Sequence, residues 1–285
     1  MYLKQIQQYL KQEVAKYVDV REVKSIVDIL IEKRIGYDAI ALNLHPRLLV
    51  PQTILEQIDR DLTLLAKNYP IQYIVEEADF FGLKLKVSSD VLIPRQETEE
   101  IVDWILKQEH RVETCLDICT GSGCIAIALA KNVSQMQVFA CDISEKALQI
   151  ATYNALQNNV KVNFFQMDIF EEYEKPDKYD VIVSNPPYIC ESEKKMMSKR
   201  VLDYEPAMAL FVPNDNPLLF YEAIAKFALR HLQQNGSIYV EINENFGAEI
   251  LRVFQDYGYA DLQLRKDING KDRMIKGTLH NNLQE

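Results

Sequence analysis

The chain has 285 residues, of which 48% are hydrophobic and 26% are charged, and this composition excludes disorder as a description of the whole. Its apolar stretches are far shorter than the roughly 20 residues that cross a bilayer, and its polar start lacks the apolar core of a signal peptide. We therefore expect a cytoplasmic protein with no membrane partner. A formal net charge of −10 disfavours stable binding to a nucleic-acid backbone.

The cysteines and histidines do not indicate a metal site. The five cysteines form no CxxC pair and lie mostly in apolar runs, so we expect buried, reduced thiols. The four histidines are scattered along the chain without the spacing of metal ligands. We predict that the protein holds no metal.

Residues 1–75 are predicted to form a small helical domain. Apolar residues recur at helical spacing, Pro51 suits the first turn of the last helix, and Pro70 lies just beyond its end. The predicted helices span residues 2–18, 20–35 and 52–68, with a short piece near 37–42.

A different pattern begins at Asp79. Leucine and valine alternate with lysine after Gly82, which predicts a β-hairpin that turns near this glycine. We assign residues 76–93 to a hairpin linker and residues 94–285 to a second domain.

The second domain is predicted to belong to the α/β class. After a helix over residues 97–110, strands and helices alternate, which predicts an open, mostly parallel sheet covered on both faces. The predicted strands are 114–118, 137–142, 161–167, 179–184, 237–243, 260–266 and 273–278, and the predicted helices are 124–132, 145–158, 218–232 and 246–257.

A loop with two glycines follows the first strand of this sheet and opens a helix, as nucleotide-binding loops do. A dinucleotide site would need GxGxxG, whereas Cys119 stands at the first glycine and no third glycine follows. S-adenosylmethionine (AdoMet) has no phosphate to hold, and loop backbone with an acidic side chain can meet its carboxylate and ammonium. The loop therefore favours AdoMet, although a tight strand-to-helix turn is the alternative interpretation.

Two acidic residues at later strand ends complete the predicted cofactor site. Asp142 can accept hydrogen bonds from both ribose hydroxyls, or it can simply cap the next helix, for which Ser144 is also available. Asp168, with Ile169 and Phe170 after it, can meet the adenine ring, or it can lie in a surface turn. The predicted cofactor-binding residues are Asp117, Cys119, Thr120, Gly121, Ser122, Gly123, Asp142, Asp168, Ile169 and Asn185.

The most specific motif is Asn185-Pro186-Pro187-Tyr188, at the end of an apolar strand. Two prolines remove two backbone donors and stiffen the loop, so its carbonyl groups stay available as acceptors. The lone pair of a planar nitrogen is delocalised, so its methylation depends on orientation. We predict that the Asn185 side-chain oxygen and the Pro186 carbonyl each accept one N–H of such a group, and that Tyr188 packs against it.

Taken together, these residues resemble the release-factor glutamine N5-methyltransferases, the PrmC/HemK family, over nearly the whole chain. The ordered motifs are Gln72-Tyr73-Ile74, Phe80-Phe81-Gly82, residues 92–99, the loop 117–123, residues 183–189, Tyr204-Glu205-Pro206, residues 239–242 and 270–273. Three positions depart from the family pattern, at Val75-Glu76, at Gln96 in place of proline and at Cys119 in place of glycine. The cysteine narrows the conformational freedom of the turn.

The resemblance implies a Rossmann-like methyltransferase domain with a seven-stranded sheet and an N-terminal helical domain that recognises the substrate. It also implies AdoMet as donor, S-adenosylhomocysteine as product, and the glutamine of the Gly-Gly-Gln motif in peptide-chain release factors as substrate. Asn185, Pro186, Pro187 and Tyr188 would be the catalytic residues.

Two alternatives remain open at this point. An adenine-N6 nucleic-acid methyltransferase uses a similar loop but must also flip a base and hold phosphates, which the net charge disfavours. A non-catalytic binding factor could keep the fold without the reaction.

Three features are not assigned by the sequence. Residues 189–216 have no clear periodicity, and we interpret them as a lid over the site. Arg95 and Glu97 fit either the site or the scaffold.

Overall fold

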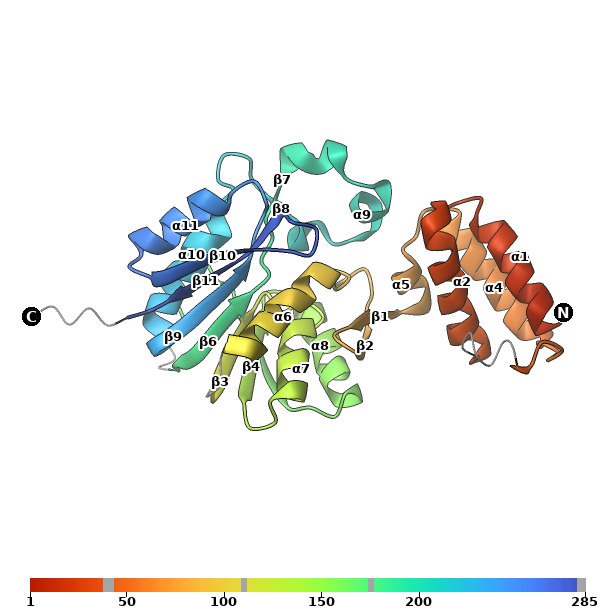
Figure 1. Ribbon diagram of the computed structural model, residues 1–285, viewed down its shortest axis with the longest axis horizontal. Helices are drawn as coiled ribbons and strands as arrows, with labels where there is room; N and C mark the ends of the chain where they lie inside the picture. Colours follow the sequence, from red (N-terminus) through yellow and green to blue (C-terminus); the bar gives the residue numbers. More distant parts are fainter. Residues whose placement is uncertain (38–43, 109–111, 174–176, 281–285) are drawn as a thin grey trace, which may run out of the picture. The chain divides into compact units, whose positions relative to one another are not determined.

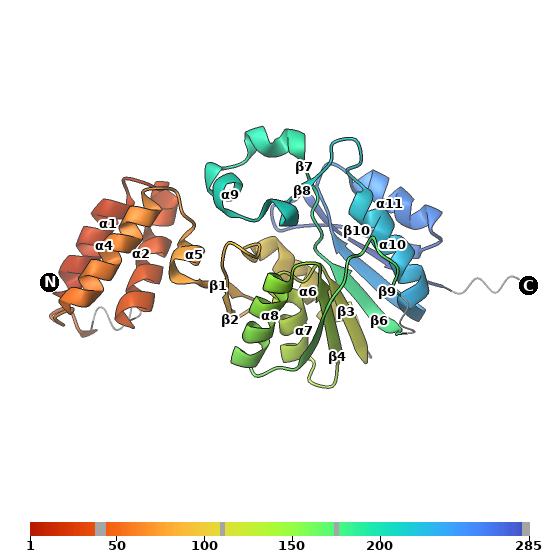
Figure 2. The same ribbon diagram turned by 180° about the vertical axis from the view of Figure 1, so that it is seen from behind.

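The computed structural model describes residues 1–37, 44–108, 112–173 and 177–280, and it divides into two compact units (Figures 1 and 2). The first unit comprises Met1–Glu76 and Ser198–Tyr204, and the second comprises Glu77–Met197 and Glu205–Glu285. The predicted short helical piece near 37–42 lies outside the described residues.

The first unit is helical, and three of its helices confirm the predicted ones. Its helices are α1 (Leu3–Val14), α2 (Val20–Ile35), α4 (Gln52–Leu65) and α5 (Ile71–Val75). In α1 the apolar residues with helical spacing are all buried, so one face of the helix forms part of the unit's core. Helix α5 was not predicted, because five residues are too few to show a period.

A buried ion pair joins α2 to α4. The Arg34 guanidinium donates to both carboxylate oxygens of Asp61, at 2.6 and 3.1 Å, and also to the Ile74 carbonyl oxygen at 2.8 Å. The two side chains are 15% and 7% exposed, so removal of one partner would leave the other charge buried and unpaired.

We expect Asp61→Ala to lower the free energy of unfolding of the helical unit by about 3 kcal/mol. Asp28→Ala is the control, because it removes an exposed pair with Lys24 on the same helix and should cost under about 0.5 kcal/mol. Hydrogen exchange of α2 and α4, followed by mass spectrometry, measures both changes. Equal protection in the two variants would contradict the role given to the Arg34–Asp61 pair.

The second unit contains a seven-stranded sheet with the order β10-β11-β9-β6-β3-β4-β5, and it confirms the predicted fold class. Strands β3, β4, β5, β6 and β9 are parallel, and β11 is antiparallel to both of its neighbours. The strands are β3 (Thr114–Ile118), β4 (Gln137–Asp142), β5 (Val162–Gln166), β6 (Tyr179–Ser184), β9 (Leu232–Glu241), β10 (Ala260–Lys266) and β11 (Asp272–Thr278).

Helices cover both faces of this sheet, as predicted (Figures 1 and 2). Val181 and Val183 of β6 pack with α6 and α7 in one core, whereas Ile182 points into the other core with α10 and α11. Burial on both faces explains why the strand is a continuous apolar run. The helices are α6 (Gln96–Gln108), α7 (Cys124–Asn132), α8 (Glu145–Gln157), α10 (Leu219–His231) and α11 (Gly247–Asp256).

The predicted hairpin consists of β1 (Glu77–Phe80) and β2 (Leu83–Lys86). Its two turn residues, Phe81 and Gly82, have φ angles of 49° and 74°. Positive φ at both positions is the conformation of a type I′ turn, which fits the twist of a two-residue hairpin. The Phe81 N–H donates to Glu99 Oε1 of α6 at 2.9 Å and so fixes the turn to the second unit.

The segment without periodicity, residues 189–216, contains short elements. These are β7 (Ile189–Cys190), the 3₁₀ helix η1 (Glu191–Met196), α9 (Lys199–Tyr204), the 3₁₀ helix η2 (Ala207–Ala209) and β8 (Phe211–Val212). Strand β7 pairs with β8, and α9 belongs to the helical unit, where the Tyr204 hydroxyl donates to the Lys67 carbonyl oxygen at 2.6 Å. None of these elements is long enough to show a period in the sequence. The interpretation of the segment as a lid stays a prediction.

Candidate active site

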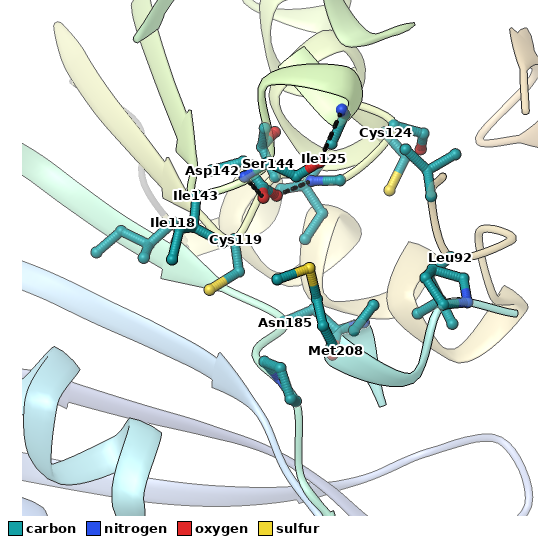
Figure 3. Close-up of a pocket in the computed structure, with 18 of the residues that line it drawn as sticks. Leu92, Ile118, Cys119, Cys124, Ile125, Asp142, Ile143, Ser144, Asn185 and Met208 are labelled. Carbon is teal, nitrogen blue, oxygen red and sulfur yellow. Dashed lines mark hydrogen bonds between the residues drawn. The ribbon is translucent and has the colours of Figure 1, made fainter. Parts of the chain in front are cut away.

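A cavity of about 270 Å³ lies at the carboxyl ends of the parallel strands (Figure 3). Loops that follow β3, β4, β5 and β6 contribute to its lining, together with residues 90–98 and 206–209. The connection after β3 runs to β4 on one side, and the connection after β6 runs toward β9 on the other, so the strand order reverses between the neighbours β3 and β6. Ligands bind at such a point in open α/β sheets, outside the carboxyl ends of the strands.

Asp142, the last residue of β4, lines the cavity and is fixed by two backbone groups. Its Oδ2 accepts from the Gly121 N–H and its Oδ1 from the Ser144 N–H, both at 2.9 Å. An ionised carboxylate has about four acceptor positions, so two remain for a ligand with two adjacent hydroxyl groups. Ser144 itself caps α8 by accepting from the Ala147 N–H at 3.2 Å, so the helix has a cap besides Asp142.

The glycine-containing loop is held in a left-handed backbone conformation. Cys119, Gly121 and Gly123 have φ angles of 60°, 56° and 81°. A Cβ atom at Gly123 would lie 3.0 Å from both Ala151 Cβ and Ile127 Cδ1, so this position requires glycine for space as well as for φ. Cys119 meets the same backbone requirement without being glycine, which is a source of strain.

Asp117 lies beneath this loop and does not line the cavity. It is fully buried, and its Oδ2 accepts from the Thr120 hydroxyl at 2.6 Å and from the Ala126 N–H at 3.3 Å. Its Oδ1 has no hydrogen-bond partner among the described residues. Burial raises the pKa of this carboxyl to about 7, against the lowering by its hydrogen bonds with Thr120 and Ala126.

Asp168 and Ile169 follow β5 and line the cavity, with Phe170 beside them. Asp168 Oδ1 accepts from the Phe170 N–H at 2.9 Å, so Oδ2 is not used in this hydrogen bond. Ile169 is 9% exposed and Phe170 is 50% exposed. A flat apolar wall beside an acceptor suits an adenine ring and its exocyclic amine.

The Asn-Pro-Pro-Tyr loop begins directly after β6. Asn185 and Pro187 line the same cavity as Asp142, whereas Pro186 and Tyr188 do not. The Asn185 side-chain nitrogen donates to Thr98 Oγ1 at 3.2 Å, and the Tyr188 hydroxyl donates to Glu241 Oε1 at 2.9 Å. Burial raises the pKa of the Tyr188 hydroxyl well above its ordinary value, so it is neutral and acts as a donor.

Two functional candidates, Thr98 and Glu241, lie in motifs that carry the family resemblance, residues 92–99 and 239–242, but sequence reasoning assigned neither residue a role. Both are 1% exposed, and the Thr98 hydroxyl donates to Glu241 Oε2 at 2.6 Å. Glu241 is an acid at the end of the apolar strand β9, next to β6 in the sheet, and this was the available signal. For Thr98 the only signal was its place in the motif 92–99, because threonine in the first turn of a helix is common.

Arg95 and Glu97 have different surroundings. Arg95 lines the cavity and its guanidinium donates to Glu205 Oε1 at 2.6 Å, while Glu205 Oε2 accepts from the Ile93 N–H at 3.3 Å. Glu97 accepts from the Asn269 side chain at 3.4 Å in an exposed contact. Arg95 therefore belongs to the wall of the cavity, and Glu97 belongs to the surface of the scaffold.

The structure brings nine of the thirteen predicted site residues to one cavity. These are Cys119, Thr120, Gly121, Ser122, Asp142, Asp168, Ile169, Asn185 and Pro187, whereas Asp117, Gly123, Pro186 and Tyr188 do not line it. Met208 of η2 also lines it, a residue that the sequence did not indicate. Within the described ranges, no three His, Cys, Asp or Glu side chains are placed to hold a metal ion. No helix in the described parts of the chain is long and apolar enough to cross a membrane.

The fold and this site define an AdoMet-dependent methyltransferase with a Rossmann-like domain. Residues 98–206 match the family model of the methyltransferase small domain. A methyltransferase from Pyrococcus furiosus has the same fold, with a TM-score of 0.53 at 17% identity over 81% of this chain and 100% of that one.

More specifically, the chain belongs to the release factor glutamine methyltransferase family. It is 42% identical to the release factor glutamine methyltransferase of Flavobacterium psychrophilum over 97% of this chain and 99% of that protein. It is 39% identical to the enzyme of the same name from Bacteroides thetaiotaomicron, over 96% of this chain and 99% of the relative.

We expect Cys119→Gly to raise the free energy of unfolding by about 0.5–1 kcal/mol. Relief of the left-handed strain exceeds the larger backbone entropy that glycine loses on folding. Gly123→Ala is the opposite change in the same loop and should cost about 2 kcal/mol, because its Cβ meets Ala151 and Ile127. Urea unfolding followed by circular dichroism measures both changes in stability. A destabilised Cys119→Gly variant would contradict the backbone strain inferred at Cys119.

Asp117 should make stability depend on pH. Its pKa is 3.8 when exposed and about 7 when folded, so between these values the folded protein holds a proton that the unfolded chain has lost. The free energy of unfolding therefore falls as pH rises through this window. Asp117→Asn does not titrate, so the difference between wild type and variant should change from about pH 4 to 7 and then level off. Urea unfolding at each pH measures the two free energies. If they ran parallel in wild type and Asp117→Asn across this pH range, the raised pKa of Asp117 would be excluded.

Proposed function

We propose that the protein transfers a methyl group from AdoMet to the side-chain amide nitrogen (N5) of a glutamine in the Gly-Gly-Gln motif of peptide-chain release factors, with S-adenosylhomocysteine as the other product. One observation carries this proposal: Asn185 lines the same cavity as Asp142 and the loop after β3. The acceptor of the reacting loop and the residues suited to AdoMet therefore face one space. The names of the relatives support release factors as substrates.

The residues of the cavity fit AdoMet in charge and shape. Asp142 has two acceptor positions left for the ribose hydroxyls, and Asp168 with Ile169 suits the adenine. The backbone from Cys119 to Gly123 would meet the methionine part. Burial raises the pKa of Asp142, and a cationic ligand beside it would favour the ionised form.

The reaction needs an oriented amide more than it needs a strong base. When bound, AdoMet supplies an electrophilic methyl carbon on a sulfonium. The Asn185 side-chain oxygen and the Pro186 carbonyl would each accept one N–H of the glutamine amide, which turns the nitrogen lone pair toward that carbon. Neither Pro186 nor Pro187 has an N–H, so the loop presents acceptors to an NH₂ group. The methylated nitrogen is more acidic and loses its extra proton to water.

The remaining assignments follow from the family and the charge. The helical unit would recognise the release factor, with the hairpin 76–93 as linker. We expect no stable nucleic-acid complex, because the net charge is −10, and we expect the protein to act in the cytoplasm, where translation takes place.

The decisive experiment incubates the protein and AdoMet with a release factor and locates any mass gain by tandem mass spectrometry. We expect one methyl group on the glutamine of the Gly-Gly-Gln motif, and none when that glutamine is replaced. Transfer to an RNA or DNA oligonucleotide instead would favour an adenine methyltransferase. Lack of AdoMet binding in calorimetry would favour a non-catalytic factor.

We expect Asn185→Ala to lower the methyl transfer rate by at least about 100-fold, because the amide loses one of its two acceptors. AdoMet affinity should stay largely intact, since Asp142 and the loop after β3 remain. Asn132→Ala serves as the control, because Asn132 ends α7 at the end far from the cavity, and its side chain donates to the Ala128 carbonyl oxygen. An active Asn185→Ala enzyme would refute the role of this side chain.

A further inference from the structure

A connected set of hydrogen bonds lies behind the reacting loop. It runs from the Asn185 side-chain nitrogen to Thr98 Oγ1, from the Thr98 hydroxyl to Glu241 Oε2, and from the Tyr188 hydroxyl to Glu241 Oε1. Thr98 and Glu241 are each 1% exposed, and they lie 143 residues apart in the chain. Neither residue lies in the Asn-Pro-Pro-Tyr motif, and Thr98 lines the cavity whereas Glu241 does not.

The direction of these bonds follows from the number of hydrogens available. The Thr98 hydroxyl donates its only hydrogen to Glu241 Oε2, and the Tyr188 hydroxyl donates to Oε1, so this carboxyl group accepts on both oxygens. Toward Asn185 the same hydroxyl can therefore only accept. Asn185 must then present its NH₂ group to Thr98, and its side-chain oxygen is left for the cavity.

This direction matters because the two ends of an asparagine amide have the same shape. If the amide were turned over, Asn185 would point a donor at the glutamine NH₂, which is also a donor, and the substrate would lose an acceptor. At 2.6 Å the bond from Thr98 to Glu241 is the shortest of the three, so it is the strong member of the set.

We propose that Thr98 and Glu241 are positioning residues that set which end of the Asn185 amide faces the substrate. Glu241 also holds the Tyr188 hydroxyl, so one buried carboxylate fixes both ends of the Asn-Pro-Pro-Tyr loop. The expected loss of activity rests on the proposed function. The direction of the hydrogen bonds does not depend on it.

The test compares Thr98→Val, which keeps the shape of the side chain without its hydroxyl, with Thr98→Ser, which keeps the hydroxyl. We expect Thr98→Val to lower kcat about 10- to 100-fold, while KM for the release factor and AdoMet affinity change less than about 2-fold. Thr98→Ser should recover kcat to within about 3-fold of wild type. Wild-type kcat in Thr98→Val, or equal loss in both variants, would overturn the proposal.

Thr114→Val is the matched control for a purely structural effect. The Thr114 hydroxyl also donates to a carboxylate, Asp180 Oδ2 at 3.0 Å, and accepts from the Asp180 N–H at 3.0 Å. It lies at the opposite end of β3 from the cavity. This variant should lose stability but keep kcat, so a fall in kcat equal to that of Thr98→Val would also overturn the proposal.

A measurement on the wild type decides the matter if Thr98→Val does not fold or if release factors prove not to be the substrate. Nuclear magnetic resonance of protein labelled with ¹⁵N-asparagine, with Asn185 assigned by its loss in Asn185→Ala, reports on the side-chain NH₂ group. We expect one of its two protons to exchange slowly with solvent. Fast exchange of both would overturn the inferred direction, whereas absence of wild-type methylation together with a protected proton would overturn only the proposed function.

Discussion

The parallel register of four neighbouring strands is the constraint on which the site depends. Ile118 of β3 pairs with Cys141 of β4 and with Ser184 of β6, and Ser184 pairs with Val240 of β9. The residues that come next in the four strands therefore emerge at one level of one edge. The loop after β3, Asp142, the Asn-Pro-Pro-Tyr loop and Glu241 all come together through this register.

Buried acids give this edge of the sheet its electrostatic character. Burial raises the pKa of Asp117, Asp142 and Glu241, against the hydrogen bonds that favour their ionised forms. Burial therefore outweighs these hydrogen bonds in all three groups, and a cation in the cavity would favour the ionised form of Asp142, which lines it. A ligand that carries an ammonium and a sulfonium group would bring positive charge close to these acidic side chains.

Stiffness is the second property of the site. The loop after β3 uses left-handed backbone at Cys119, Gly121 and Gly123, and the loop after β6 uses two prolines. Behind the second loop, Ser184 donates to the Ile118 carbonyl oxygen at 2.7 Å and ties the two strand ends together. The side chains with which these two loops line the cavity are therefore held by backbone that has little freedom to move.

The sequence by itself determined the elements that have a period and the motifs that sit at their ends. Apolar runs with strand or helix spacing predicted the sheet, its covering helices and the positions of the two loops, because burial of apolar surface selects those patterns. It also gave Asp142 and the Asn-Pro-Pro-Tyr loop as site residues, since both directly follow strands that must end at the same edge. Elements as short as α5 and α9 have no period and were missed.

Only the tertiary structure decided which distant polar residues meet. Thr98 with Glu241, and Arg95 with Glu205, are pairs separated by more than one hundred residues, and each becomes a contact only through the packing of α6 and of residues 93–95 against the sheet edge. A hydrogen bond acts over about 3 Å, so its partners depend on the register and packing of the whole unit and not on local spacing. For the same reason the sequence predicted Asn185 as a site residue, but only the packing shows that its side chain contacts Thr98, which in turn donates to a carboxyl group on another strand.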